Sequence, residues 1–221
     1  MEVKLSENMR EEYSDIKIGI LEVRSVINKR GDPRLEEEKR RLEAFIRKNY
    51  SDVKNLEVIK SYNRFFKKYG KTYPILYQIQ SILSGRRLPS ISAVVEAMFM
   101  AELKNMFLTA GHDLDSLKGS LETKLTKGTE KYVKINGKEQ RLKAGDIVTT
   151  DAVGIISSVI YGPDHRTRVT ENTRNHLFFS YFPYGEDDIN IKRHFRNILE
   201  NIRIFSDKEL ESEEIKIFPR S

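Results

Sequence analysis

The sequence predicts a single α+β domain in which helices come first and a sheet follows. Between Pro33 and Asn105 the apolar residues recur at helical spacing. After Asn105 the pattern changes to short strand-like runs separated by Gly, Asn and Asp turns. A chain of 221 residues is long enough to bury one sizeable core, and no internal repeat or linker divides it. One domain covering residues 1–221 is therefore the simplest arrangement.

Residues 1–50 combine two strand-like patterns with one helix. The strand-like patterns lie at 1–5 and 15–28, where apolar residues alternate with polar ones. Gly31-Asp32-Pro33 then starts a helix, because the Asp32 side chain can accept hydrogen bonds from free N–H groups and Pro33 suits the first helical position.

Residues 51–104 are predicted to be helical. One helix follows Ser51-Asp52 and ends at Gly70, the next runs from Pro74 to Ser84-Gly85, and the last covers 93–105.

The helix at 93–105 is apolar nearly all round, which predicts that it is buried. It nevertheless contains Glu96 and Glu102. Because buried unpaired acids are rare, we expect both side chains to face solvent or to cap backbone amides, rather than to act as catalytic carboxylates.

Residues 105–205 are predicted to be β-rich, with one closing amphipathic helix at 186–204. Asn136-Gly137 is the strongest turn signal, because this pair favours a tight hairpin. The tail, 206–221, is acidic before a short, apolar, strand-like end. Strand-like runs lie at 106–110, 120–126, 131–135, 146–152, 154–162 and 175–182.

Composition and charge favour a cytoplasmic protein with a polyanionic partner. The net charge is +6, and a basic surface attracts phosphates. The absence of cysteine excludes disulfides, zinc fingers and thiol nucleophiles. No apolar run is long enough to span a bilayer and no signal peptide opens the chain, so no membrane partner is expected. No cofactor or metal is expected either, because the chain has no Gly-rich phosphate loop, nucleophile elbow or two-histidine metal helix.

His112 and Asp113 are the candidate catalytic residues. They lie beside Gly111 and Asp115 at the end of a predicted strand, where we expect a turn. An imidazole beside a carboxylate is held in one tautomer and becomes more basic, which suits it to activate water. For His112, the alternatives are a structural partner of Asp113 and a ligand for a polar substrate. For Asp113 and Asp115, the alternatives are binding of a metal ion and capping of a turn.

The segment 162–175 is the candidate substrate-binding surface. Its arginines can contact phosphate and its threonines can donate hydrogen bonds, although a solvated loop capped by its own threonines is an alternative. The aromatic residues that follow can stack on bases, but their crowding in one strand is more typical of a core. The residues of interest are Gly162, Asp164, His165, Arg166, Thr167, Arg168, Thr170, Thr173 and Arg174.

A fixed order of short motifs runs from residue 113 to the aromatic strand. Asp-Leu-Asp at 113–115 is followed by Leu-x-Gly at 117–119, Asn136-Gly137, TDAVGIISSVIYG at 150–162 and VTENTRN at 169–175. This order resembles the B3/B4 domain, the editing module in the β-subunit of phenylalanyl-tRNA synthetase. The helices, with SILSGRRLPSISAVVEA at 81–97, look more like freestanding members of that family. The resemblance covers about residues 50–205.

The resemblance implies N-terminal helices packed on an irregular β-sandwich with a pocket near its centre. In the synthetase, that pocket hydrolyses tyrosine mistakenly attached to the phenylalanine tRNA. It therefore implies tRNA or aminoacyl-tRNA as the partner, and not DNA. The residues that would form the pocket or contact the substrate are His112, Asp113, Gly162, Asp164, His165, Arg166, Thr173, Asn175 and Phe179.

The sequence departs from the synthetase pattern at this pocket. Ala110 takes the place of the family's histidine, three positions before the first aspartate of Asp-Leu-Asp, and His112 can substitute because it would project from the same face of a strand. Phe179 takes the place of the acid that binds the tyrosine hydroxyl, so an apolar amino acid fits better. Gly162-Pro163 is all that remains of a glycine-rich turn, which leaves fewer amides to face a carbonyl.

Two functions are compatible with these residues. The first is binding of tRNA or its charged end, with hydrolysis of a mischarged aminoacyl-tRNA ester as the reaction. The alternative is a non-catalytic module that binds a small metabolite or a free amino acid, which the missing histidine and acid favour. An assembly or regulatory role has only the acidic tail and Phe218 in its favour. The sequence does not indicate an oligomeric state.

Overall fold

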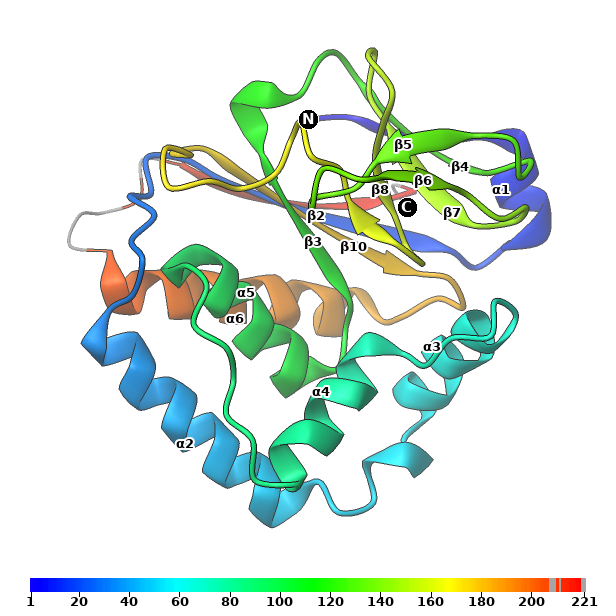
Figure 1. Cartoon of the computed structure of the whole chain (residues 1–221). Helices are drawn as coiled ribbons and strands as arrows, with labels where there is room; N and C mark the ends of the chain where they lie inside the picture. Colours follow the sequence, from blue (N-terminus) through cyan, green and yellow to red (C-terminus); the bar gives the residue numbers. More distant parts are fainter. Residues whose placement is uncertain (207–209, 211, 220–221) are drawn as a thin grey trace.

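The computed structural model describes residues 1–206, 210 and 212–219. A four-stranded sheet lies at its centre, with a five-stranded sheet on one face and helices on the other (Figure 1). The α+β class with helices packed on two sheets is confirmed. Among the described residues, no helix combines the length and the apolar composition needed to cross a lipid bilayer.

The two sheets draw their strands from distant parts of the chain. The central sheet has the order β11-β2-β10-β3, from β2 (Lys17–Val23), β3 (Thr109–Asp113), β10 (His176–Phe182) and β11 (Glu213–Phe218). The outer sheet has the order β1-β4-β7-β8-β9, from β1 (Val3–Leu5), β4 (Leu121–Leu125), β7 (Ile147–Thr150), β8 (Ile155–Ser158) and β9 (Gly162–Pro163). A separate hairpin pairs β5 (Lys131–Val133) with β6 (Glu139–Arg141).

The helices gather on the free face of the central sheet, except for the short α1 beside the outer sheet (Figure 1). They are α1 (Glu7–Glu12), α2 (Pro33–Asn49), α3 (Glu57–Lys67), α4 (Pro74–Leu83), α5 (Ala93–Asn105) and α6 (Asp188–Phe205). Short 3-10 turns, η1 and η2, cover Val53–Asn55 and Leu114–Ser116.

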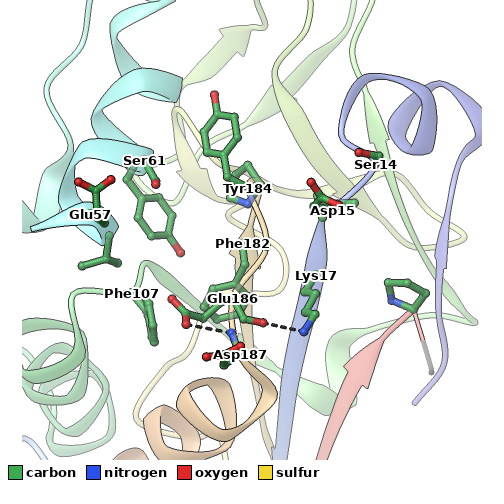
Figure 2. A pocket seen from close by; sticks show the side chains of 16 residues that line it. Ser14, Asp15, Lys17, Glu57, Ser61, Phe107, Phe182, Tyr184, Glu186 and Asp187 are labelled. Carbon is green, nitrogen blue, oxygen red and sulfur yellow. Dashed lines mark hydrogen bonds between the residues drawn. The ribbon is translucent and has the colours of Figure 1, made fainter.

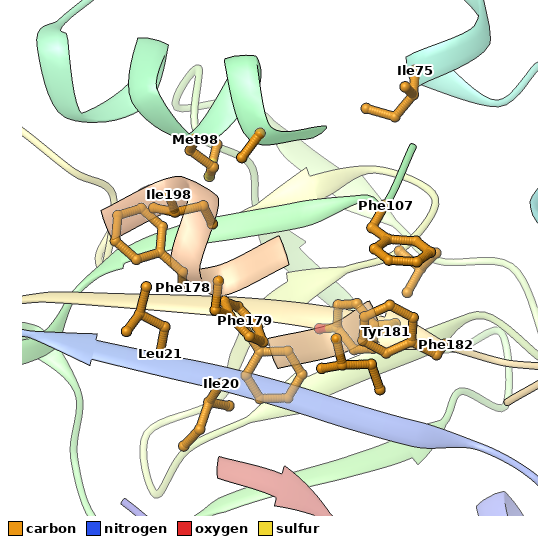
Figure 3. Close-up of a cluster of buried hydrophobic side chains, with 14 of the residues drawn as sticks. Ile20, Leu21, Ile75, Met98, Phe107, Phe178, Phe179, Tyr181, Phe182 and Ile198 are labelled. Atoms are coloured by element: carbon orange, nitrogen blue, oxygen red, sulfur yellow. The ribbon is translucent and has the colours of Figure 1, made fainter. Parts of the chain in front are cut away.

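Strand β10 is buried on both faces, which explains its continuous aromatic run. Ser180 faces the helices, where its hydroxyl oxygen lies 2.9 Å from that of Thr109. Its neighbour Tyr181 faces the outer sheet, where its hydroxyl oxygen lies 2.9 Å from Oγ1 of Thr149. The aromatic side chains pack with residues of β2, α5 and α6 in one cluster (Figure 3). The prediction that this crowding marks a core is confirmed.

Helix α6 lies close to the central sheet because Gly19 of β2 has no side chain. A Cβ atom at Gly19 would lie 2.5 Å from Cε2 of Phe195 and 2.9 Å from Cγ2 of Ile191. Real Cβ atoms do not approach other atoms this closely, so the contact between α6 and β2 requires glycine at this position.

A buried ion pair joins α2 to α5. Nζ of Lys39 lies 2.8 Å from Oε2 of Glu96, and both side chains are almost fully buried. The other oxygen of Glu96 accepts a hydrogen bond of 2.7 Å from the backbone N–H of Ile91, just before the helix. Of the two alternatives expected for Glu96, solvent exposure or contact with a backbone amide, the second is confirmed.

Local sequence signals placed several elements correctly. Oδ1 of Asp32 accepts a hydrogen bond of 2.9 Å from the N–H of Arg34, as expected at the start of a helix. Asn136-Gly137 forms the turn between β5 and β6, and Gly137 has a φ of +79° that favours glycine. The end of the predicted tail forms β11, while residues 207–209, 211 and 220–221 lie outside the described residues.

Other boundaries differ from the prediction. The strand expected at 15–28 ends at Val23, because Ser25 has a φ of +62° that interrupts an extended backbone. The second predicted helix begins at Glu57, after the 3-10 turn η1. Helix α1 was not predicted. His112 and Asp113 lie within β3, and not in a turn beyond its end.

Candidate functional site

A cavity of about 600 Å³ opens where the helices meet one edge of both sheets. Its walls come from α4, α5, β3, the turn between β8 and β9, and residues 169–171. Helix α5 contributes Val95, Met98, Phe99 and Glu102, whose spacing of three and four residues places them on one helical face.

The cavity wall is mostly apolar. Ile75 comes from α4, Ala110 from β3, and Ile160 from the turn after β8. Ile91 and Ile135 line the cavity and are about half exposed, at 52% and 50%, which places them at its mouth. A site of this kind suits a ligand with an apolar body.

Glu102 brings a carboxyl group into this apolar wall. Its side chain is buried, and Oε1 accepts a hydrogen bond of 2.6 Å from the backbone N–H of Thr109. Burial raises the pKa of the Glu102 carboxyl well above its ordinary value, although the Thr109 amide acts in the opposite direction. Burial in this apolar wall therefore favours the neutral form of the Glu102 carboxyl group. Of the two alternatives expected for Glu102, solvent exposure or contact with a backbone amide, the structure shows the second.

Gln78 of α4 is a second polar group in the lining. Its Oε1 atom is buried and has no hydrogen-bond partner among the described residues. A buried amide oxygen without a partner is uncommon in folded proteins, so Gln78 is a candidate for contact with a ligand.

His112 is fully buried on β3, two residues from Ala110, and is not part of the cavity lining. Its Nδ1 lies 2.8 Å from Oγ1 of Thr167, and that hydroxyl donates to Oδ1 of Asp164. Since a threonine hydroxyl has one proton, it must accept from Nδ1–H of His112. Nε2 is then unprotonated, and it has no partner in the described part of the chain. Burial, helped by Arg166, lowers the pKa of His112 to about 4.

Asp113 lies on the opposite side of β3 from His112, because successive side chains alternate along a strand. Its Oδ1 accepts a hydrogen bond of 3.0 Å from the N–H of Asp115, and its Oδ2 accepts one of 3.3 Å from the hydroxyl of Thr173. Asp115 in turn accepts hydrogen bonds of 2.9 and 3.0 Å from Nδ2 of Asn175. These contacts are those of a capped turn. In the part of the chain that the structure describes, no group of three or more His, Cys, Asp or Glu side chains is placed to hold a metal ion.

Arg166 is held by internal contacts. Its guanidinium donates to Oδ1 of Asp151 at 2.9 Å and to the carbonyl oxygen of Ser116 at 2.8 Å. Asp164 accepts hydrogen bonds of 3.1 Å from the N–H groups of Arg166 and Thr167, which fixes the turn that carries them. Arg166 therefore stabilises segment 164–168 in this structure.

The remaining predicted site residues lie in different surroundings. Gly162 lines the cavity with a φ of +85°. His165 is partly buried, and its Nδ1 lies 3.0 Å from NH1 of Arg168. Phe179 is fully buried and packs against Tyr181, with ring centroids 4.8 Å apart.

Residues 60–201 match the family model of the B3/4 domain, which is more than half of the chain. The chain belongs to the B3/4 domain family. It is 37% identical over 78 residues to the phenylalanine–tRNA ligase β subunit of Mycoplasma pneumoniae, in a match that covers 35% of this chain and 10% of that protein. The structure is similar, with a TM-score of 0.47 and 14% sequence identity, to an N-terminal fragment of the phenylalanyl-tRNA synthetase β-subunit from Pyrococcus horikoshii, over 96% of this chain and 49% of that one. The chain thus spans a small part of the curated relative and about half of the solved fragment.

The cavity of this B3/4 domain lies almost wholly within the matched range, since every lining residue except Asn28 falls between 60 and 201. Among the predicted site residues, all of which are described, Gly162 and Thr170 are in the lining. Prediction from the sequence missed Gln78, which gave no signal, and undervalued Glu102. An acid in a helix that is otherwise apolar all round was the signal available for Glu102.

A second cavity of about 680 Å³ lies between α3, the residues before β2 and the loop after β10 (Figure 2). Glu57 and Asp187 line it beside aromatic side chains. Lys17 also lines it, but its Nζ is bound to Oδ1 of Asp188 at 2.8 Å and to the carbonyl oxygen of Glu186 at 2.6 Å. Because its carboxylates would repel phosphate groups, this cavity of the B3/4 domain is a poor site for a nucleic-acid end.

Proposed function

We propose that this B3/4 domain protein binds the aminoacylated 3′ end of a tRNA, with the amino acid in the apolar cavity. The observation that carries the proposal is this 600 Å³ cavity, built from the part of the chain that matches the B3/4 domain. A relative over part of that range is named as a phenylalanine–tRNA ligase β subunit, which supports a tRNA ligand.

Basic side chains near the mouth support contact with the terminal nucleotides. Nζ of Lys71 lies 5.2 Å from the ring centroid of Tyr161, which lines the cavity. Lys134 directly precedes Ile135 at the mouth. In the described part of the chain, neither lysine forms an ion pair with an acid. Both are therefore available to contact phosphates of a single-stranded end.

The reaction in this proposal is hydrolysis of the aminoacyl ester. Water adds to the ester carbonyl carbon, the bond from that carbon to the ribose oxygen breaks, and a proton from water passes to the ribose oxygen. His112 supplies the base, because its Nε2 is an unprotonated nitrogen without a partner. Contact with the ester requires segment 164–168, which carries the Thr167 hydroxyl, to move away from His112. Asp113 and Thr173 stabilise the turn behind that segment.

A specific observation favours a second candidate, which is binding of a free amino acid or small metabolite without catalysis. Ala110 occupies the position that the family resemblance assigns to a histidine, and the carboxyl group in the cavity wall, Glu102, has a raised pKa. A protonated carboxyl group cannot accept a proton from water, so the neutral form of Glu102 cannot act as the base.

The test measures binding and turnover separately. Binding uses tRNAs that carry an amino acid through a stable amide bond, compared with the same uncharged tRNAs. Ile135→Trp at the mouth should weaken binding of the charged end at least about tenfold, or about 1.4 kcal/mol. Val133→Trp is the matched control, because Val133 is 47% exposed on the same hairpin and is not part of the lining. Turnover uses a panel of labelled aminoacyl-tRNA esters, with His112→Ala beside the wild type.

The outcomes separate the two candidates. Selective ester hydrolysis that His112→Ala abolishes supports the deacylase. Preferential binding of charged tRNA without turnover supports binding alone, and selective binding of free amino acids without tRNA supports the second candidate. Equal affinity of both tryptophan variants for charged tRNA would refute the cavity as the binding site.

A further inference from the structure

The exposed side of α3 carries a stripe of basic side chains that continues into the turn after the helix. They recur at spacings of three and four residues, which places them on one helical face, opposite the buried face that includes Ile59 and Phe66. No acidic residue occurs between Glu57 and Glu96. The stripe consists of Lys60, Arg64, Lys67, Lys68 and Lys71, all of which are exposed.

Helix α2 shows how charges on an exposed helical face are usually arranged in this protein. Its Arg40 lies 3.0 Å from a carboxylate oxygen of Glu36 and 2.7 Å from one of Glu43. Its Arg41 likewise contacts two further glutamates of the same helix. The basic groups of α2 are therefore neutralised within the helix and do not attract a distant polyanion.

The stripe on α3 loses its acidic partners toward the C-terminal end of the helix. Nζ of Lys60, near the start, lies 2.8 Å from Oε1 of Glu57. Nζ of Lys68 comes only within 3.9 Å of Glu12. In the described part of the chain, Lys67 forms no ion pair. This end of α3 thus has a surplus of positive charge.

The β5–β6 hairpin brings a second basic segment next to the same end of α3 (Figure 1). Residues 127–143 contain six basic and two acidic side chains. Of the two acids, Glu130 accepts hydrogen bonds from backbone amides, and Glu139 forms an ion pair within the hairpin. Nζ of Lys143 donates a hydrogen bond of 3.1 Å to the carbonyl oxygen of Tyr69, in the turn after α3. The negative end of a helix dipole favours cations in the last turn of α3, but it does not account for basic residues of a separate segment beside it.

The resulting surface, which we call the α3 basic surface, lies between the two cavities. It borders the apolar cavity at Lys71, whose Nζ lies 5.2 Å from the ring centroid of Tyr161 in the lining. At the opposite end of α3, Glu57 lines the second cavity with Asp15 and Asp187, and these carboxylates would repel phosphate (Figure 2). A polyanion is therefore favoured along the C-terminal half of α3 and disfavoured beyond it. The α3 basic surface consists of Arg64, Lys67, Lys68 and Lys143.

We propose that the α3 basic surface binds phosphates of the base-paired stem that continues from the single-stranded 3′ end of the tRNA. This rests on the proposed function, because the stem lies beside α3 when the charged end enters the apolar cavity. Lysine ammonium groups are point charges on flexible stems, and contacts to phosphate carry no base information. Binding of the stem should therefore be independent of its sequence.

The composition of this surface favours a duplex over a single strand. Proteins that bind single strands combine basic groups with exposed aromatic rings on which the bases stack. The aromatic residues of α3 and of the turn after it are buried, so they are not available for stacking. They are Tyr62, Phe65, Phe66 and Tyr69. In a duplex the bases stack on one another and the phosphates face outward, so basic side chains alone suffice.

Three labelled RNA probes measure the contribution of the stem by fluorescence anisotropy at one fixed salt concentration. The first is an RNA hairpin whose stem continues into a single-stranded 3′ end that carries phenylalanine through a stable amide bond. The second is the same charged single-stranded end without the stem, and the third is the first probe with every base pair exchanged. We expect the first probe to bind at least about tenfold more tightly than the second, and the third to bind within about twofold of the first.

Paired variants connect the contribution of the stem to this surface. Arg64→Gln with Lys67→Gln should lower the slope of log affinity against log salt by about 2 for the first probe, and leave the affinity for the stemless probe unchanged. Lys48→Gln with Lys54→Gln is the matched control, because it removes the same charge from exposed positions outside the surface. All four side chains are exposed, so both variants should fold, which circular dichroism verifies.

The results distinguish this inference from the proposed function. Equal affinity for the stemmed and stemless probes overturns the inference, and so does a strong dependence on the sequence of the stem. A loss in the Arg64 and Lys67 variant that matches the control, or that is equal for both probes, also overturns it. If Ile135→Trp weakens binding of the charged end while the stem adds nothing, the inference alone fails. If the stem binds through Arg64 and Lys67 while Ile135→Trp has no effect, the inference is upheld and the cavity is not the site of the charged end.

Discussion

Asp146 should make the stability of this protein fall as pH rises from about 4 to about 7. Its side chain is fully buried, where Oδ2 accepts a hydrogen bond of 2.6 Å from Oγ of Ser158 and Oδ1 accepts one of 3.4 Å from the N–H of Ile160. Burial nevertheless raises the pKa of Asp146 from 3.8 to about 7. The negative charge of Asp146 contributes to raising the pKa values of the tyrosines around it, which are Tyr13, Tyr69, Tyr132, Tyr161 and Tyr181.

The sign and the size of the effect follow from the two pKa values. Below pH 3.8 Asp146 is protonated in both the folded and the unfolded chain, so it does not change the free energy of unfolding. Between 3.8 and about 7 the unfolded chain loses the proton first, so the free energy of unfolding falls as pH rises and then levels off. The whole difference corresponds to about 4 kcal/mol.

Asp146→Asn removes the titration and keeps the shape of the side chain. The chain has no tryptophan, so urea unfolding is followed by circular dichroism, for both proteins, between pH 4.5 and 8.5. The stability of the Asn variant relative to the wild type should improve by several kcal/mol across this range. Ser158→Ala is a second variant that should extend the loss of stability to higher pH, because it removes a donor to the carboxylate and so raises the pKa of Asp146 further. A difference between Asn variant and wild type that is constant with pH would refute this reasoning.

Three further predictions concern packing and the cavity. Lys39→Met should lower the free energy of unfolding by about 3–5 kcal/mol in urea, because it leaves Glu96 buried without its cation; a loss under about 1 kcal/mol would contradict this. Gly19→Ala should destabilise by about 1–3 kcal/mol, because its Cβ would lie 2.5 Å from a ring carbon of Phe195, and an unchanged Tm would show that α6 can shift without loss. Gln78→Leu should raise the Tm by about 2–4 °C, because it removes a buried oxygen without a partner; a lower Tm would show that Gln78 has a structural role.

Much of the fold could be predicted from local patterns. The start of α2 at Asp32 and the hairpin turn at Gly137 depend on neighbours a few residues away, and both were found. The order of strands within the sheets depends on contacts between distant segments. Strand β1 pairs with β4 through Val3 and Leu121, and no periodicity in either segment specifies that partner. The early end of β2 depends on a left-handed backbone at Ser25, a residue type that gives no warning of it.

The site was harder to predict because burial decides its chemistry. His112 does share a face of β3 with Ala110. Its separation from the cavity results from segment 164–168, which pairs with β3 at Arg168, more than fifty residues away. The rarity of buried acids argued against Glu102. That statistic describes charged side chains, whereas burial in an apolar wall favours the neutral form of the Glu102 carboxyl group.

His112 and Glu102 together limit what the cavity can do. Burial lowers the pKa of His112 to about 4 and raises the pKa of Glu102 above its ordinary value, so burial favours the neutral form of both groups. The cavity lining includes Glu171 and contains no basic side chain, so it does not attract a polyanion. Attraction of a tRNA must therefore come from the exterior, from basic side chains such as Lys71 and Lys134. Replacing Lys134 by Gln should lower the slope of log affinity against log salt by about 0.7 while the preference for charged over uncharged tRNA stays the same. Lys48→Gln, at the end of α2 and absent from the lining, is the matched control. If Lys134→Gln instead altered the preference for charged tRNA, attraction and selection would not be separate properties of this surface.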